Sequence, residues 1–157
     1  MQNIKKISLI VLVFIATMMI TGCGNKNVEG TLEDLMTKVY QDVPEDKRPM
    51  MLENITLNDD NIEYYIGTKD VPYEEALASE SGIGSTAHSV VLLRVKDGES
   101  VEDVKTAIKD NVNPRKWVCV GVEDDEVIIK NKGNLVILII VADEDTRATL
   151  EEGFDNL

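Results

Sequence analysis

The thiol of Cys23, which follows a short basic start and an apolar run, is placed where a covalent modification can be expected. Met1–Lys6 contains two lysines, Ile7–Ile20 is almost entirely apolar, and Thr21 and Gly22 are small residues just before the cysteine. This order is typical of a secretory signal with a cleavage site. A cysteine directly after the cut marks the lipoprotein form of such a signal. We therefore predict that a diacylglycerol is attached to the Cys23 thiol and that the chain is cleaved before it.

The leader also defines the domain organisation. Its apolar run is shorter than the roughly 20 residues that a membrane-spanning helix needs. We predict a signal peptide over residues 1–22, a lipidated tether over 23–30 and a single globular domain over 31–157. An uncleaved anchor helix is the alternative, but it does not require Thr21 and Gly22. The predicted location is extracytoplasmic, on the outer face of the cytoplasmic membrane, with the membrane as a partner through the lipid.

Composition excludes several function classes. Without Lys5 and Lys6 of the leader, 14 lysines and arginines face 29 acidic residues, a formal charge of −15 over 135 residues. Such a chain is repelled by nucleic acid phosphates and by anionic headgroups. With Cys23 acylated, Cys119 is the last thiol, which excludes an intramolecular disulfide and a zinc cluster built from cysteines. We predict no cofactor and no metal site.

The single histidine and the second cysteine are the natural candidates for catalysis. His88 could serve as a general base for Ser89 or for a hydroxyl of the Ser81–Thr86 loop. Adjacent residues of a strand point to opposite faces, however, so His88 and Ser89 do not form a dyad. The simpler interpretation is a ring that bonds a loop carbonyl. Cys119 lies between valines and is expected to be a buried, inert thiol. We assign no catalytic residue.

A turn with two cations and a tryptophan is the most suggestive binding motif. In Asn113–Trp117, Arg115 and Lys116 precede Trp117 in an otherwise acidic protein. Together with His88, these three residues are candidates for holding an anionic group or for stacking on a partner. The alternative, which we prefer, is a proline turn with Trp117 in the core and Arg115 paired with a nearby carboxylate.

Two further segments are better explained by structure than by chemistry. The acidic Glu123–Glu126 lacks the spacing of a calcium loop and is expected to be a hairpin turn. Ser81–Thr86 contains two glycines, but no lysine follows the second one, so it is not a phosphate-binding loop. We expect a mobile loop there.

Hydrophobic periodicity predicts an α+β fold. Helices are expected after Thr31, Ser100 and Asp143 or Asp145, with a short helical turn at 50–53. Leu135–Val141 is apolar at every position and suits a central strand covered on both faces. The remaining strands are expected at 62–66, 74–80 (at an edge), 88–96, 117–122 and 127–130. The order predicts a single-domain layered sandwich, a mostly antiparallel sheet with helices packed on it, ferredoxin-like in part from residue 88 onward.

The chain also resembles a known family. Ala87-His88-Ser89, Arg94 and Asn113–Trp117 carry a likeness, over about residues 32–141, to small Gram-positive lipoproteins described only as a domain of unknown function. The resemblance implies a signal, a lipid anchor and one domain, and it implies no activity.

The favoured function is a lipid-anchored, non-enzymatic binding or accessory protein of the cell envelope. The first alternative is a small envelope enzyme or ligand-binding domain that uses His88, the Ser81–Thr86 loop and Arg115. The second is an acidic protein that binds cations at its surface.

Overall fold

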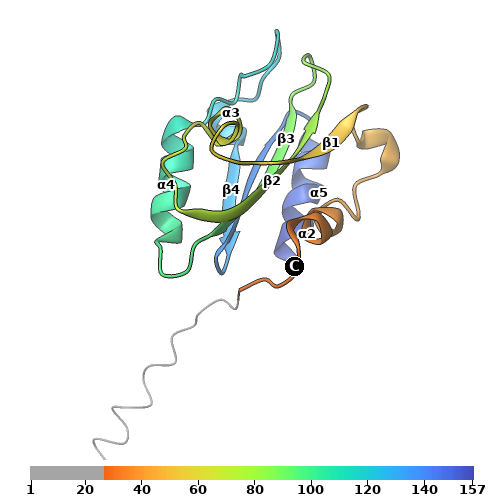
Figure 1. Ribbon diagram of the computed structural model, residues 1–157. Helices are drawn as coiled ribbons and strands as arrows, with labels where there is room; N and C mark the ends of the chain where they lie inside the picture. The colour runs from red at the N-terminus through yellow and green to blue at the C-terminus, as the bar shows by residue number, and fades with distance from the viewer. Residues whose placement is uncertain (1–26) are drawn as a thin grey trace, which may run out of the picture.

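One five-stranded antiparallel sheet organises the protein (Figure 1). The computed structural model describes residues 27–157, so the expected signal peptide, Cys23 and residues 24–26 lie outside the described residues. The strand order is β1-β2-β3-β5-β4, and every neighbouring pair is antiparallel. The strands are β1 Leu52–Thr56, β2 Tyr73–Ser81, β3 His88–Val95, β4 Ile128–Lys132 and β5 Leu135–Val141.

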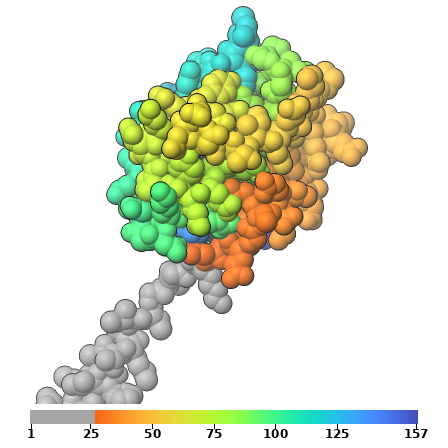
Figure 2. Space-filling view, in the orientation of Figure 1, coloured from red at the N-terminus to blue at the C-terminus, as the bar shows by residue number. Residues whose placement is uncertain are grey.

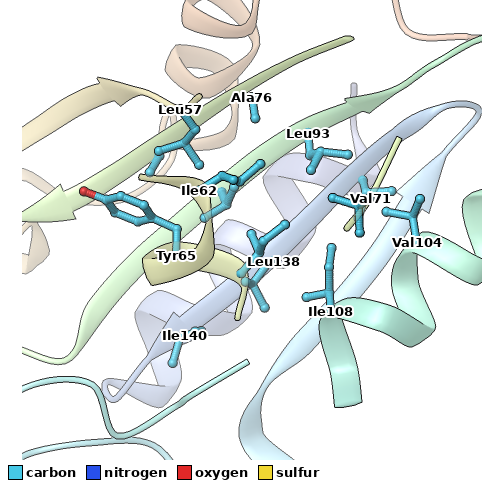
Figure 3. Packing of buried hydrophobic residues seen from close by; sticks show 14 of the residues in the cluster. Leu57, Ile62, Tyr65, Val71, Ala76, Leu93, Val104, Ile108, Leu138 and Ile140 are labelled. Atoms are coloured by element: carbon cyan, nitrogen blue, oxygen red, sulfur yellow. The ribbon is translucent and has the colours of Figure 1, made fainter. Parts of the chain in front are cut away.

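Helices cover both faces of this sheet. Helices α2 (Leu32–Val39) and α5 (Glu144–Asp155) pack on one face, and α3 (Ile62–Ile66) and α4 (Val101–Asn111) pack on the other (Figure 1). Side chains alternate along a strand, so β3 and β5 contribute to both cores. Figure 3 shows part of the core beneath α3 and α4. All seven residues of β5 are buried, as expected for a central strand. The α+β prediction is confirmed.

The three long helices begin where capping residues satisfy their first amide groups. The side chains of Thr31, Ser100 and Asp143 accept hydrogen bonds from the amides of Asp34, Asp103 and Thr146. Each capping side chain thus accepts a hydrogen bond from a backbone N–H that has no partner within the helix. These starts are the ones that the sequence predicts.

The second half of the chain contains a split β-α-β unit. β3, α4 and β4 follow one another, and β5 lies between the two strands. This is the part for which a ferredoxin-like arrangement is expected. Here α4 and α5 lie on opposite faces of the sheet, because β3 and β5 are apolar on both sides.

Several element predictions are wrong. Residues 62–66 form helix α3 instead of a strand, because Ile62, Tyr65 and Ile66 share one helical face and Gly67 ends the helix at a φ of 83°. Residues 50–53 do not form a helical turn, because Met50 and Met51 form a non-helical turn and Leu52 and Glu53 are the first residues of β1. Since β1 is the edge strand on that side, β2 is an interior strand.

The stretch after α4 is also different from the prediction. Residues 117–122 form an irregular loop instead of a strand. Cys119 has a φ of 61°, which is outside the range of extended strands. The acidic Glu123–Glu126 is not a hairpin turn, because Asp124–Glu126 forms a short 3-10 helix, η2.

The described part of the expected tether is fixed to the domain. The Arg94 guanidinium donates hydrogen bonds to the carbonyl oxygens of Val28 (2.7 Å) and Gly30 (2.8 Å). The Asn134 amide donates to the Asn27 side chain at 3.2 Å, and Val28 packs against the core. Residues 27–30 are therefore bonded to the domain, at the end of the sheet where the β4–β5 turn lies (Figure 1).

Candidate functional site

His88 lies at the start of β3 and is buried, with 4% of its surface exposed. Its Nε2 shares a 2.7 Å hydrogen bond with the Tyr40 hydroxyl. Burial lowers the pKa of His88 to about 4, and it raises the pKa of Tyr40. The ring is therefore neutral near pH 7. Its partner is a tyrosine hydroxyl and not the loop carbonyl that the sequence suggests.

The sheet separates His88 from its neighbour in sequence. His88 bonds Tyr40 from α2, whereas the Ser89 hydroxyl lies 3.3 Å from the Lys116 ammonium on the other face. The two side chains point to opposite faces, as the alternation of a strand requires. The arrangement places the candidate base and the Lys116 loop on different sides of the sheet.

Lys116 is the most unusual charge in the domain. Its side chain is 4% exposed, and its Nζ lies 2.6 Å from Glu80 Oε2. The ammonium also sits 4.4, 4.6 and 5.1 Å from the ring centres of Tyr64, Tyr65 and Trp117. A buried charge loses its hydration, so it needs a partner and polarisable surroundings; aromatic faces attract a cation. Burial lowers the pKa of Lys116, and the Glu80 carboxylate opposes that shift.

Trp117 is in the core at 8% exposure, and its Nε1 is buried without a hydrogen-bond partner among the described residues. Arg115 is exposed and forms an ion pair with Glu123, which raises the Arg115 pKa. The preferred interpretation of this turn, a core tryptophan beside a paired arginine, agrees with the structure. Of the four candidate binding residues, His88, Lys116 and Trp117 are internal, and only Arg115 reaches the surface.

The buried Lys116 fixes a surface that sequence reasoning missed. Five large hydrophobic side chains are exposed among residues 27–157, with exposures between 36% and 75%, and we call them the distal surface: Met50, Met51, Tyr64, Val118 and Val120. They lie on the loop before β1, on α3 and on the loop after α4. Packing, and not any sequence pattern, decides that these five apolar residues point outward.

Hydrogen bonds join the segments that carry the distal surface. The Gly82 amide donates to the Met51 carbonyl at 2.9 Å, and the Val118 amide donates to the Gly84 carbonyl at 2.8 Å. The Tyr64 hydroxyl donates to Glu80, the partner of Lys116. In Figure 2 the teal loop around Val118 and the green β2–β3 loop lie together at the top of the molecule. The Ser81–Thr86 loop therefore supports this surface.

Backbone strain is concentrated at the same place. Met51 (φ 54°) and Cys119 (φ 61°) are the two non-glycine residues with positive φ in the described part of the chain. Such conformations cost energy and cluster at functional sites. Cys119 is exposed, which corrects the expectation of a buried thiol. The reason is that the loop turns at Cys119 instead of continuing as a strand. With Arg115, Trp117, Val120 and Gly121, it lines an open pocket of about 380 Å³.

Across the described residues, no three or more histidine, cysteine or acidic side chains gather in a way that could hold a metal ion. None of the helices in that same region has the length and apolarity to cross a membrane. Comparison with protein-family models, curated proteins and solved structures finds no match to this chain. The resemblance to small Gram-positive lipoproteins therefore stays a prediction.

The burial of His88 predicts a specific dependence of stability on pH. Its pKa is about 4 in the folded protein and 6.5 for the unperturbed group, so the unfolded chain binds the proton first as pH falls. His88 should therefore lower the free energy of unfolding progressively from about pH 6.5 to pH 4, by about 3 kcal/mol in total. Denaturant unfolding of wild type and His88→Gln at pH 7 and pH 4 measures this. A stability difference that stays constant with pH would contradict it.

The Lys116–Glu80 pair predicts strong coupling between two substitutions. Lys116→Met leaves a buried carboxylate without its partner and should destabilise the fold by about 3–5 kcal/mol. The double variant Lys116→Met/Glu80→Met removes both charges and should regain most of that loss. Unfolding in urea tests both variants. Equal stability of the single and double variants would show that the two charges act independently.

Proposed function

We propose that this protein is a lipid-anchored, extracytoplasmic binding protein of the cell envelope that contacts its partner through the distal surface. The observation that carries the proposal is the position of the five exposed hydrophobic residues. They gather at one end of the sheet, on strained loops held by a buried ion pair. Exposed apolar patches on soluble domains mark interaction sites, and methionine adapts well to a partner's shape.

The anchor and the distal surface lie at opposite ends of the domain. Residue Asn27 is bonded to Asn134 beside the β4–β5 turn. The distal surface adjoins the other end of the sheet, where β1 begins and β2 leads into the loop before β3. A lipid on Cys23 would thus hold the domain by one end and present the other end to partners.

The contacts of the candidate site residues support a binding role more than a catalytic one. The His88 ring is buried against Tyr40, and Lys116 is paired with Glu80. Arg115 is paired with Glu123. An enzyme centred on His88 and Arg115 would need a site that reaches around the sheet. We therefore favour a binding role over the envelope enzyme.

The anchoring part of the proposal predicts the fate of a Cys23→Ala variant. Without the thiol no lipid can be attached, so the variant should appear in the medium or accumulate as an unprocessed precursor. Fractionation of cells, with mass measurement of the mature N-terminus, distinguishes these products. A variant that is processed normally and stays in the membrane fraction as wild type does would refute the lipid anchor.

The binding part predicts that Cys119 is shielded in native membranes. This thiol lies between Val118 and Val120, so a bound partner should slow its reaction with a membrane-impermeant maleimide severalfold relative to the purified protein. Met50→Ser/Val118→Ser removes apolar contacts and should abolish the shielding. The variant Ala148→Cys/Cys119→Ser, with its thiol on the exposed side of α5, is the matched control and should react equally in both preparations. Equal labelling of wild-type Cys119 in both would contradict the proposed binding role.

A further inference from the structure

We infer that the partner of the distal surface is a protein whose apolar contact patch is bordered by lysine or arginine side chains. This inference rests on the proposed function and specifies the chemistry of the partner. It follows from the charges around the distal surface and from the position of that surface relative to residue 27.

The cations near the distal surface are engaged within the domain. Arg115 is paired with Glu123, and Lys116 is paired with Glu80. Arg48, two residues before Met50, donates to the carbonyl oxygens of Val43 and Tyr40. Two of these cations are therefore neutralised by carboxylates, and the guanidinium of Arg48 is directed at backbone carbonyls.

The carboxylates around the same surface have no such partners. Glu53 lies on β1, two residues after Met51, and Glu63 lies on α3, directly before Tyr64. Asp124 and Asp125 lie in η2, directly after Glu123 of the Arg115–Glu123 pair. All four are exposed, and none forms an ion pair with a described residue. The border is therefore acidic, in a chain with a formal charge of −15 from Cys23 onward. A cationic border on the partner complements it.

Geometry argues against a lipid surface as the occupant. The four Cα-to-Cα steps from Cys23 to Asn27 can span at most about 14 Å, and Asn27 is bonded beside the β4–β5 turn. From that turn, β5 rises about 23 Å toward the distal surface. The anchored end and the distal surface therefore face opposite directions. Anionic headgroups would also be repelled by the acidic border.

The same geometry argues against a second copy of this chain. Two copies that meet through their distal surfaces carry their residue 27 at opposite ends of the pair. Lipids on both copies could not then enter one membrane. Such a pair would also bring two acidic borders together, and like charges at an interface oppose association. A different protein is the occupant that meets both constraints.

The test measures the shielding of Cys119 in native membranes as the salt concentration and the border charge are varied. Raising NaCl from about 0.05 M to about 0.5 M shortens the range of electrostatic attraction and should speed maleimide labelling severalfold. Glu63→Gln/Asp124→Asn should have the same effect at low salt. The matched control Asp97→Asn/Glu99→Gln neutralises two exposed acids of the β3–α4 turn and should leave the shielding intact.

Each other outcome has a distinct meaning. Shielding that resists both salt and border neutralisation would overturn the cationic partner but leave the binding role standing. Shielding of the purified protein by phosphatidylglycerol vesicles would identify a lipid occupant and overturn the inference. So would a bismaleimide cross-link between the Cys119 thiols of two copies. Absence of shielding under every condition would refute the proposed function itself.

Discussion

Burial of β5 on both faces is the constraint on which the rest of the fold depends. Seven consecutive apolar residues in one strand cannot face water on either side. One helix layer is therefore not enough, and α2 with α5 must cover one face while α3 with α4 cover the other. This requirement places the split β-α-β unit in a three-layer arrangement and leaves the ends of the strands as the accessible part of the sheet.

At one of these ends, a buried charge determines the shape of the surface. The Lys116 ammonium needs Glu80 and three aromatic rings to compensate for lost hydration. The contacts of Lys116 with Glu80 and the aromatic rings hold the loop after α4 against the sheet, and Trp117 is buried beneath this loop. The next residues are then forced outward, and Val118, Cys119 and Val120 become exposed. A polar interaction inside the domain thus creates an apolar surface outside it.

At the other end, Arg94 holds residues 28–30 against the domain. Its guanidinium holds the carbonyls of Val28 and Gly30, and it also pairs with Glu75 at 2.7 Å. Residues 27–30, which the sequence predicts to be part of the tether, are therefore bonded to the folded domain. Asn27 and the distal surface consequently lie at opposite ends of the sheet, so the proposed lipid on Cys23 would orient the domain.

The features that depend on the local order of residues could be predicted before the fold was known. Capping residues and three- to four-residue periodicity placed α2, α4 and α5, and continuous apolar runs placed β3 and β5. The acidic character is likewise a property of composition. The proposed anchor at Cys23 also depends only on neighbouring residues, and it awaits its test.

The short elements and the candidate site depend instead on contacts between distant parts of the chain. Residues 62–66 suit a strand or a helix by periodicity alone, and packing of Ile62 and Ile66 under the sheet selects the helix. The run Trp117–Val122 alternates as a strand would, but the Lys116–Glu80 pair joins residues 36 positions apart and fixes the run as a loop. Exposure of the distal surface follows from such long-range contacts, and no local pattern encodes them.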